Sequence, residues 1–518
     1  MMKKITTFII TLLISATTVM MAQQADAEYK LLSRKYEVKN DGSMTYNYRK
    51  ELKLNSQRAF FSVYGESFIV YNPEYQTLKI NEAYTLRADG SRVDAPKNAF
   101  VEQLPSACAD CGYYNAFREM VVVHTALEKG ATIVLDYTIT SRPGLLLEKI
   151  VFAEDAPIAK YVVDVKVAGQ DIFYSVANPS AKVVFKRIGD RYTWTGTNLP
   201  QTTAEYYAPA LDKIYPTLYI SSLQDLNNIM PTDITLPQTA VDFVSSVGGK
   251  EQMEQAKIIL DHVTANVRLN NVSLAQTGLC FRNASEVWNS NCGNAFEKTL
   301  LLNAMLRAVG FNSDVVFKYD TLDCNGQKFY FPKTEAVAFS YEGQDYELSA
   351  LRASKIEPLG KSLNAKSLTT EEKLFVTPNG NDLECTSLKG KKKMVKLADG
   401  YYALYLEQPI GGVTVLPWQL EGKRNYPLVC GTTKILCHYT VEIPEKVRLV
   451  GKTMNITVSK PFGYMQIKIE QKGNTLDVVR TLSITQDTIP VSQYADFKAM
   501  MLQWHDANYK RLVFAVEN

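Results

Sequence analysis

Residues 284–311 read ASEVWNSNCGNAFEKTLLLNAMLRAVGF, a polar start that turns apolar soon after Cys292. The apolar side chains that follow cover nearly every face of a helix. We therefore predict a buried helix over about 293–308, at the centre of its domain. A thiol at the N-terminus of a helix faces unpaired backbone N–H groups and the positive end of the helix dipole. Both favour the thiolate, so Cys292 is a candidate nucleophile.

A second helix precedes this segment, and strands follow it. Apolar residues recur at helical spacing and predict an amphipathic helix; they are Met253, Ala256, Leu260, Val263 and Val267. Strands are expected over residues 314–319, 336–341 and 345–348, the last two joined at Glu342-Gly343. Helices followed by antiparallel strands predict an α+β unit over residues 240–355.

The chain before this unit has the pattern of β-structure. Runs such as 132–139 and 161–167 are rich in β-branched residues. Turn dipeptides of the kind found in hairpins separate such runs, at Asp41-Gly42, Asp89-Gly90 and Gly189-Asp190. We predict a large antiparallel β-domain over residues 28–220, built as a sandwich or a folded sheet, and a proline-rich connection after it.

The chain after the α+β unit returns to strand-like alternation. We predict an irregular, charged linker over residues 356–400 and a smaller β-domain over residues 401–518. Strands are expected over 447–450 and 464–469, with a turn at Gly473-Asn474. A short helix is expected near 492–503, before a final strand. The fold class is thus multidomain α+β, with an α+β unit between two β-domains.

The first residues have the composition of an export signal. Lys3 and Lys4 precede an uncharged stretch, and Ala25-Asp26-Ala27 fits the small-x-small pattern of a cleavage site. We predict a signal peptide over residues 1–27, with cleavage after Ala22 or Ala27. No second long apolar segment follows. We therefore expect no membrane span, and a protein exported to the periplasm, the cell envelope or the extracellular space.

The composition of the 518-residue chain bounds its domain count and its partners. This length exceeds one hydrophobic core, so about three domains are expected. The net charge of +3 gives no reason to expect nucleic acid as a partner. The four histidines are too scattered for a metal site, and no phosphate-binding glycine loop is present. We predict neither a metal nor a cofactor.

Eight cysteines lie beyond the signal sequence, and an exported chain is expected to pair some of them. Cys108 and Cys111 are close enough in sequence to close a small loop, and Cys430 with Cys437 could staple a hairpin. The first pair is also compatible with half of a zinc site or a redox pair. Since no second pair at zinc spacing and no βαβ pattern is present, a local disulfide is the simpler interpretation.

The middle unit resembles the transglutaminase-like, papain-related superfamily. The resemblance rests on Asn291-Cys292-Gly293 and on the helix end Leu306-Arg307-Ala308-Val309-Gly310-Phe311. The domain order is also similar to that of secreted bacterial proteins with an N-terminal β-rich domain of unknown function and a C-terminal β-domain. Segments 194–205 and 462–464 carry this wider likeness.

In active members of this superfamily, a His on one strand takes the thiol proton and an Asp on the next strand orients the imidazole. The resemblance puts the His position at Thr334 or Glu335 and the Asp position at Ser349. A carboxylate at Glu335 would be a weak base near pH 7, and its charge would raise the pKa of the cysteine. Ser349 has no charge to support an imidazolium, so the triad is incomplete.

The four histidines offer little replacement. His262 lies on the earlier helix, off its apolar stripe, and we interpret it as a surface residue. His124, His438 and His505 lie outside the α+β unit and would have to reach Cys292 across a domain boundary. Without a base, Cys292 is either a buried structural thiol or paired with Cys280 or another cysteine.

These observations favour a catalytically degenerate protein that acts as a scaffold or binds a peptide, a glycan or another cell-envelope partner. The alternative is an active cysteine amidase, protease or acyl transferase that attacks peptide or cell-wall amides through Cys292, with a base recruited from elsewhere. A third hypothesis, a carbohydrate-binding β-protein, requires rows of exposed aromatic side chains on one sheet face.

Overall fold

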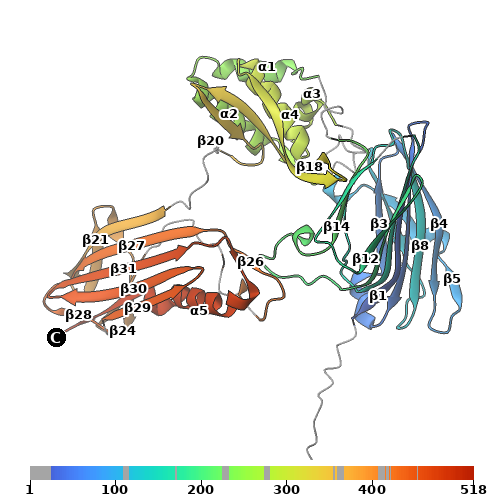
Figure 1. Ribbon diagram of the computed structural model, residues 1–518. Coiled ribbons are helices and arrows are strands. Elements are labelled where there is room, and N and C mark those ends of the chain that lie inside the picture. Colours follow the sequence, from blue (N-terminus) through green and yellow to red (C-terminus); the bar gives the residue numbers. More distant parts are fainter. Residues whose placement is uncertain are drawn as a thin grey trace, which may run out of the picture.

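The computed structural model shows folded units dominated by β-strands (Figure 1). The structure describes residues 25–108, 116–169, 172–224, 233–272, 281–353, 356–358, 367–398, 400–406, 415, 419–420, 422–451 and 453–517. An N-terminal β-sandwich, a central unit of helices and strands, and a C-terminal β-domain follow one another along the chain. The prediction of a β-rich, multidomain protein is confirmed.

One layer of the N-terminal domain is an eight-stranded sheet. Its strands, in spatial order, are β12 (Val183–Ile188), β13 (Arg191–Leu199), β10 (Ile158–Val167), β1 (Ala27–Val38), β2 (Met44–Leu54), β8 (Thr132–Ser141), β4 (Gln76–Leu86) and β5 (Arg92–Asp94). The predicted hairpin dipeptides lie at the β1–β2, β4–β5 and β12–β13 turns. β1 and β10 pair in parallel, with Leu32 opposite Tyr161, so the predicted purely antiparallel arrangement is wrong at this pair.

Two three-stranded sheets form the other layer. One has the order β3 (Glu66–Tyr71), β7 (Arg118–Val123) and β6 (Phe100–Gln103), and the other β11 (Phe173–Ala177), β14 (Thr217–Ser221) and β9 (Leu147–Val151). Because side chains alternate along a strand, every second residue faces the space between the layers. On β10, for example, Tyr161, Val163 and Val165 are fully buried in the core that β1, β2, β9 and β14 share.

The central unit packs helices against an antiparallel sheet. Its helices are α1 (Gln238–Val247), α2 (Gln252–Asn266), α3 (Ala284–Ser290) and α4 (Ala295–Ala308), and its sheet has the order β17 (Ser313–Cys324), β18 (Gln327–Tyr341), β19 (Gln344–Leu348) and β20 (Ile356–Pro358). A short parallel bridge joins β15 (Arg268–Leu269) to β16 (Cys292–Gly293). The predicted helices and strands of this unit are all present.

Helix α4 is the centre of this unit, as predicted. Every residue from Phe296 to Leu306 is buried. The other helices and strands β17 and β18 all contact α4. The N-cap of α4 is Asn294, two residues after Cys292, so the helix begins slightly later than expected.

The C-terminal domain is a two-sheet structure with one helix on its core. Its large sheet has the order β23 (Gly390–Lys392), β22 (Asp382–Ser387), β21 (Ser367–Asn379), β27 (Thr433–Glu442), β31 (Thr475–Ile484), β30 (Gly463–Lys472) and β29 (Met454–Lys460). The second sheet has the order β24 (Met394–Ala398), β25 (Tyr401–Tyr405), β33 (Arg511–Val516) and β28 (Val447–Leu449), and β26 (Leu428–Val429) pairs with β32 (Thr488–Ile489). Helix α5 (Tyr494–His505) is the predicted short helix before the final strand.

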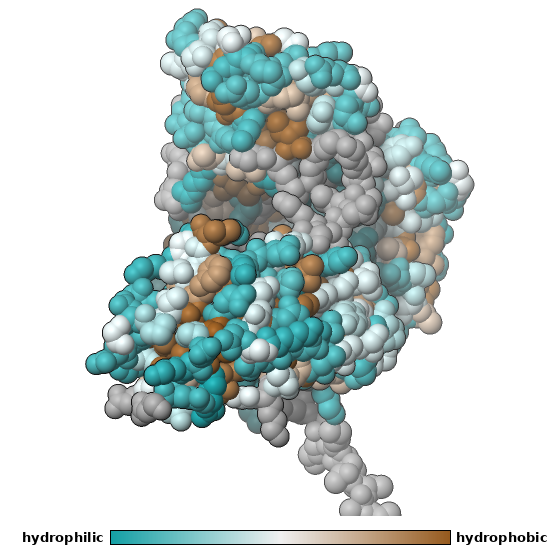
Figure 2. All heavy atoms as spheres, turned by 90° about the vertical axis from the view of Figure 1, so that its left-hand side faces the viewer, coloured by the Kyte–Doolittle hydropathy of each residue, from teal (hydrophilic) through white to brown (hydrophobic). Residues whose placement is uncertain are grey.

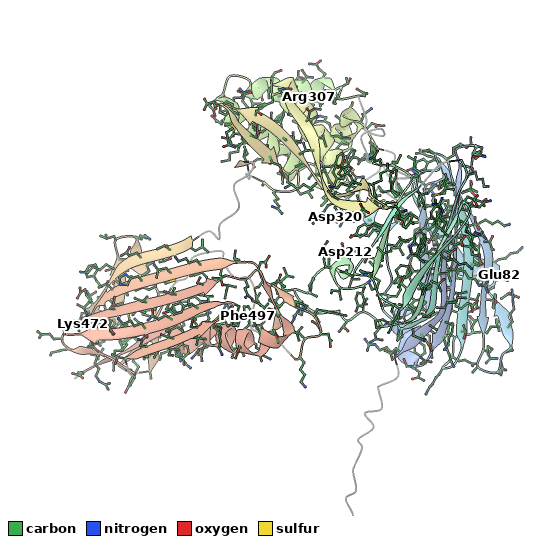
Figure 3. The ribbon with its side chains drawn as sticks, in the orientation of Figure 1. Glu82, Asp212, Arg307, Asp320, Lys472 and Phe497 are labelled. Carbon is green, nitrogen blue, oxygen red and sulfur yellow. The ribbon has the colours of Figure 1, made fainter. Side chains whose placement is uncertain are left out.

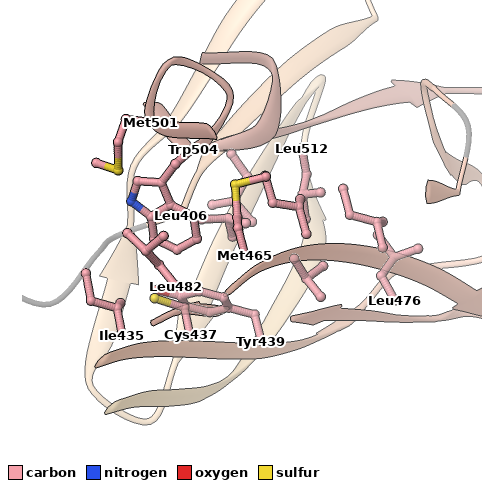
Figure 4. Close-up of a cluster of buried hydrophobic side chains, with 14 of the residues drawn as sticks. Leu406, Ile435, Cys437, Tyr439, Met465, Leu476, Leu482, Met501, Trp504 and Leu512 are labelled. Atoms are coloured by element: carbon pink, nitrogen blue, oxygen red, sulfur yellow. The ribbon is translucent and has the colours of Figure 1, made fainter. Parts of the chain in front are cut away.

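The core of this domain lies between α5 and the large sheet. Figure 4 shows Met501 and Trp504 of α5 above Cys437 and Tyr439 of β27. These side chains belong to one cluster of buried residues. Arg480 is also fully buried here, and its Nη2 donates a hydrogen bond to the carbonyl oxygen of Trp504 at 2.7 Å.

The predicted irregular linker over residues 356–400 is wrong. From Ser367 onward this segment is sheet, because β21 pairs in parallel with β27, with Leu374 opposite Val441. The alternation was obscured by clustered charges, such as those at 389–393, at the turn and on the exposed face of these strands. The C-terminal domain therefore begins near residue 367.

The N-terminal sandwich contacts the central unit through an extended hairpin. Strands β17 and β18 project from the helices, and Asp320 of β17 lies near the junction with the sandwich (Figure 3). There Phe329 and Phe331 of β18 pack against Tyr219 of β14. These apolar contacts fix the hairpin on the second layer of the sandwich.

The segment after the sandwich, predicted as a proline-rich connection, lies against the C-terminal domain. Arg424 Nη2 is 3.5 Å from Glu205 Oε2, and both side chains are almost fully buried. The hydroxyl groups of Tyr215 and Tyr426 are hydrogen-bonded to each other. The connection is therefore an interface with specific polar contacts.

Ala27, which we predicted as the last residue of the signal peptide, is the first residue of β1. It is 1% exposed and lies opposite Leu54. The carboxylate of Asp26 accepts a hydrogen bond from Ser56 Oγ at 2.6 Å. The folded domain thus begins before the predicted boundary, and residues 1–24 lie outside the described part of the chain.

In the part of the chain that the structure describes, no helix is long and apolar enough to span a membrane. The face shown in Figure 2 is mostly hydrophilic over the C-terminal domain, with scattered hydrophobic patches. The prediction that no helix spans a membrane agrees with this finding.

Candidate functional site

Cys292 lies in a tight bend between α3 and α4. Helix α3 ends at Asn291, which has a left-handed backbone with φ of 50°. The N–H of Arg268 donates to the carbonyl of Asn291 at 2.8 Å, and the N–H of Asn270 donates to that of Gly293 at 2.9 Å. This parallel bridge holds Cys292 ahead of α4 rather than in its first turn.

The N-terminus of α4 is capped by its own side chains. Asn294 Oδ1 accepts a hydrogen bond from the N–H of Glu297 at 2.9 Å, and Glu297 Oε2 accepts one from the N–H of Asn294 at 3.1 Å. Such a capping box satisfies N–H groups that would otherwise be available to a thiolate. The Glu297 side chain is 1% exposed, so its carboxylate already offsets the positive end of the helix dipole.

Arg282 completes this arrangement from the other side. Its Nη2 lies 2.8 Å from Glu297 Oε2 and also donates to the carbonyl oxygen of Cys292 at 2.8 Å. Its Nη1 donates to Ser290 Oγ at 3.1 Å. The guanidinium, 14% exposed, therefore ties the backbone of Cys292 to the start of α4.

The sulfur of Cys292 is in a disulfide. The other cysteines that the structure describes are free, so its partner lies outside the described residues. A disulfide sulfur has no thiolate form and cannot act as the attacking nucleophile. The predicted candidate nucleophile is therefore blocked, and pairing with another cysteine, the alternative considered above, is what the structure shows.

The N-terminal domain covers this disulfide. Cys292 is 2% exposed and clusters with Cys108 and Phe117 of the sandwich. Val70 and Leu104, also from the sandwich, pack against the same cluster. A substrate could reach the sulfur only after these contacts had opened.

The two predicted local disulfides are absent. Cys108 is a free thiol, and its proposed partner Cys111 lies outside the described residues. Cys430 and Cys437 are both free. The strand register keeps Cys430 and Cys437 too far apart to form a disulfide.

Cys437 lies inside β27, whereas Cys430 precedes the start of this strand at Thr433. Cys437 lies opposite Arg480, whereas the N–H of Cys430 bonds to the carbonyl of Asp487, beyond the end of β31 at Ile484. From Thr433 at the start of β27 to Cys437, four residues of extended chain cover about 13 Å. This exceeds the Cα separation that a disulfide spans.

Glu335 is, with Thr334, one of the two positions at which the resemblance expects the catalytic base. It lies on β18 opposite Phe317, and alternation puts it on the same face as the buried Val337 and Phe339. Phe317 stacks on Phe296 in the first turn of α4, with ring centroids 5.4 Å apart. The position is thus at the cysteine end of α4. Burial raises the pKa of the Glu335 carboxyl, but the side chain is no substitute for an imidazole.

Ser349 and Thr334 add no catalytic group. Ser349 directly follows β19, and its hydroxyl oxygen accepts a hydrogen bond from the N–H of Leu351 at 3.3 Å. Thr334 lies on β18 opposite Lys318, and only its backbone is described. The positions that the resemblance assigns to the base and the acid therefore lie on β18 and directly after β19.

The histidines of the central and C-terminal units have other neighbours. His262 stacks on Trp288, with ring centroids 5.2 Å apart, and on Phe243 at 4.0 Å. His438 Nε2 lies 2.7 Å from Asp477 Oδ1 in the C-terminal domain. The interpretation of His262 as a surface residue is wrong, since it is half-buried in an aromatic cluster, where burial lowers its pKa.

His124 belongs to a polar cluster that the sequence analysis missed. Ser67 Oγ lies 2.7 Å from His124 Nε2 and accepts a hydrogen bond from Lys50 Nζ at 2.6 Å. All three residues are buried inside the sandwich. Burial and the nearby ammonium lower the pKa of His124 to about 3, so its ring is neutral at pH 7.

The available signal for this cluster was the inward position of Lys50 on β2, between Tyr48 and Leu52. Because the three side chains are enclosed, we describe the cluster as a core network. Within the described residues, no group of His, Cys, Asp or Glu side chains is arranged to hold a metal ion.

Comparison with known proteins matches the two β-domains to families. Residues 40–203 match a domain of unknown function, DUF3857, and residues 402–514 match another, DUF3858. The central unit with Cys292 lies between the two matched regions. No curated protein matches the chain.

One solved structure is similar over nearly the whole chain. It is described as a "putative protease" from Parabacteroides distasonis ATCC 8503, is 28% identical, has a TM-score of 0.79, and the match covers 95% of this chain and 100% of that one. An M1 zinc metallopeptidase from Deinococcus radiodurans is 11% identical over 47% of this chain and 54% of that one, with a TM-score of 0.20. The second similarity is too weak to carry an argument.

Proposed function

We propose that this chain is an exported, transglutaminase-like protein that has lost catalysis and acts as a scaffold or binding protein. The observation that carries the proposal is the buried disulfide at Cys292. It removes the nucleophile at the one position where the resemblance expects it. Glu297 also accepts a backbone N–H at the start of α4 and pairs with Arg282, so these donors are no longer available to stabilise a thiolate.

The elements around Cys292 support the family assignment within this proposal. A buried helix follows the cysteine, and two antiparallel strands carry the positions of the acid and base. Glu335 and Ser349 occupy these positions. The arrangement is that of a catalytic core whose reactive groups have been replaced.

The proposal of export has two supports. The first residues have the charge and apolar pattern of a signal peptide. A disulfide is stable in an oxidising compartment and rare in the cytosol. Cleavage after Ala22 would leave the contacts of Asp26 and Ala27 in the sandwich intact, so we favour it over cleavage after Ala27.

Alkylation tests the loss of catalysis. The folded protein is treated with iodoacetamide from about pH 5 to about pH 9, a range around the reference thiol pKa, and labelled peptides are identified by mass spectrometry. We expect no label on Cys292 without reductant, while the half-buried free thiols Cys324 and Cys430 provide an internal comparison. Fast labelling of Cys292 in the untreated protein, absent from Cys292→Ala, would show an activated thiolate and overturn the proposal.

A cysteine amidase, protease or acyl transferase remains the second candidate, favoured by the similarity to a "putative protease" at 28% identity. Such an enzyme would need Cys292 reduced and the covering contacts of the sandwich released. Hydrolysis of peptide amides is therefore measured with and without a mild reductant. We expect no turnover above that of Cys292→Ala, and turnover that depends on Cys292 would establish the enzyme.

A further inference from the structure

The interior of the N-terminal sandwich contains an arginine where the strand pattern requires an apolar residue. Leu32, Tyr36 and Val38 of β1 are buried in the core between the layers. Alternation puts Arg34 on the same face. Charged residues are almost never placed in such a row unless they are paired or functional.

A glutamate occupies the matching position on the opposite layer. Leu146, Ile150 and Phe152, in and beside β9, face the same core. Glu148 lies in this row by alternation. Two opposite charges, from strands far apart in the sequence, therefore face the interior of one domain.

Arg34 and Glu148 line one cavity of about 240 Å³. Its polar wall includes Tyr36 and Tyr137, and its apolar wall includes Ile69, Ile139 and Leu145. The side chain of Arg34 is 28% exposed, although its neighbours in the row are buried, because it faces this space. A cavity of this volume is far larger than a single water molecule needs and is enough for a molecule of amino-acid size.

The two charges are incompletely satisfied by the protein. Arg34 Nε is buried without a hydrogen-bond partner, and its nearest carboxylate is Glu154, with Oε1 3.8 Å from Nη2. The positive charge of Arg34 attracts the Glu148 carboxylate, but this attraction does not offset the desolvation of the carboxylate. Burial therefore raises the pKa of this carboxyl. Partly buried charges that the protein satisfies incompletely destabilise a fold, so a partner from outside is the simplest reason to keep them.

We propose that this cavity binds a zwitterion of amino-acid size with an apolar side chain. Its carboxylate would lie at the Arg34 guanidinium, its ammonium at the Glu148 carboxylate, and its side chain along the apolar wall. A simple anion would leave Glu148 unsatisfied, a simple cation would leave Arg34 unsatisfied, and a neutral sugar would neutralise neither charge. The proposal does not depend on whether the central unit is catalytic.

Titration calorimetry with four probes tests the chemistry of the ligand. L-leucine carries both charges, N-acetyl-L-leucine lacks the ammonium, L-leucinamide lacks the carboxylate, and glucose is neutral. We expect saturable binding of L-leucine, and at least about tenfold weaker binding of both blocked forms, since each loses a hydrogen-bonded charge. No heat of binding at millimolar L-leucine, or equal affinity for all four probes, overturns the proposal.

Variants assign the two ends of the ligand. Glu148→Gln is expected to weaken L-leucine at least about tenfold while leaving N-acetyl-L-leucine unchanged or tighter. Arg34→Lys keeps the positive charge but loses the planar guanidinium that can donate two hydrogen bonds to one carboxylate. It is expected to weaken the binding of L-leucine and of N-acetyl-L-leucine alike. Glu51→Gln and Arg49→Gln are matched controls, because these residues pair with each other on the outer face of β2. Equal losses in the controls would contradict a binding role for the cavity.

The Cys292→Ala variant separates this inference from the proposed function. Cys292 does not line the cavity, so the affinity of this variant for L-leucine should equal that of the parent protein. Turnover through Cys292 would overturn the proposed function without affecting this inference. Absence of L-leucine binding would overturn this inference without affecting the proposed function.

Discussion

Charged side chains are paired with each other at the start of α4, but they are incompletely paired in the interior of the N-terminal sandwich. At α4, Arg282 and Glu297 form a buried ion pair that also caps the helix and holds Cys292. In the sandwich, Arg34 and Glu148 face a cavity without completing each other. The first region is where the resemblance expects a catalytic cysteine, and its contacts are structural. The second has no resemblance to support it, yet it keeps the unsatisfied groups that a binding site requires.

The largest loss of stability should come from breaking the Arg282–Glu297 ion pair at the start of α4. Glu297→Ala leaves the Arg282 guanidinium buried without its carboxylate and removes half of the capping box, so we expect a loss of about 3–5 kcal/mol in the free energy of unfolding of the central unit. Hydrogen exchange of α4 peptides in urea measures it.

The matched control is Glu254→Ala, which breaks the exposed Lys250–Glu254 pair on α2. It should change stability by about 0.5 kcal/mol or less. A similarly small loss for Glu297→Ala would show that the pair at α4 is dispensable.

The next effect should come from removing the disulfide. Cys292→Ala is expected to keep the fold and to lose about 2–4 kcal/mol, because the cross-link no longer restricts the unfolded chain. Urea unfolding of the parent protein with and without reductant should give a similar difference. Cys324→Ala, at a free and half-buried thiol, is the control. If reductant and Cys292→Ala change nothing, the disulfide is not formed in solution.

The sequence predicted the central unit well because its signals are local. The apolar run of α4, the periodicity of α2 and the turn at Glu342-Gly343 each lie within one element. The same holds for the hairpin dipeptides of the sandwich. β21 was missed, since its pairing with β27 joins segments more than 60 residues apart, and charges on its exposed face resemble those of a linker.

The site residues also differ in whether local sequence could reveal them. Glu335 and Ser349 could be placed by counting along strands, and this placement is why we propose that the acid and base are lost. The disulfide state of Cys292 was not, because connectivity cannot be derived from spacing. Arg34 and Glu148 were also missed. A row of Leu32, Arg34 and Tyr36 with a charge at its centre resembles a partly exposed strand face until the second layer is known to cover it.

The third effect concerns acid stability of the sandwich. The pKa of His124 is about 3 in the folded state and 6.5 ordinarily, so the unfolded chain binds a proton that the folded domain does not as pH falls below about 6.5. Stability contributed by neutral His124 is therefore lost on acidification, by about 2 kcal/mol between pH 7 and pH 5.

His124→Asn should remove most of this pH dependence, measured as urea midpoints of the N-terminal domain at the two pH values. Lys50 faces His124 but stays charged across this range, since its own pKa is about 8. Buried Glu148 and Glu154 have raised pKa values and act in the opposite direction, which is why the difference between variant and parent is the quantity to compare. His438→Asn, in the C-terminal domain, should leave the midpoints of the sandwich unchanged.

The smallest effect should have the opposite sign from the first. Burial raises the pKa of Glu148, so its charged form destabilises the sandwich at pH 7, and Glu148→Gln should slightly stabilise the ligand-free domain. A carboxyl with a raised folded pKa destabilises only above its unfolded pKa, so the gain should vanish near pH 4, where the group is protonated in both states. Glu51→Gln, on the outer face of the same domain, should show no such gain. Glu148→Gln would then be more stable and bind L-leucine less well, the combination expected of a residue kept for binding. If instead it destabilises the domain as Glu297→Ala does the central unit, Glu148 is a structural residue and the contrast between the two regions fails.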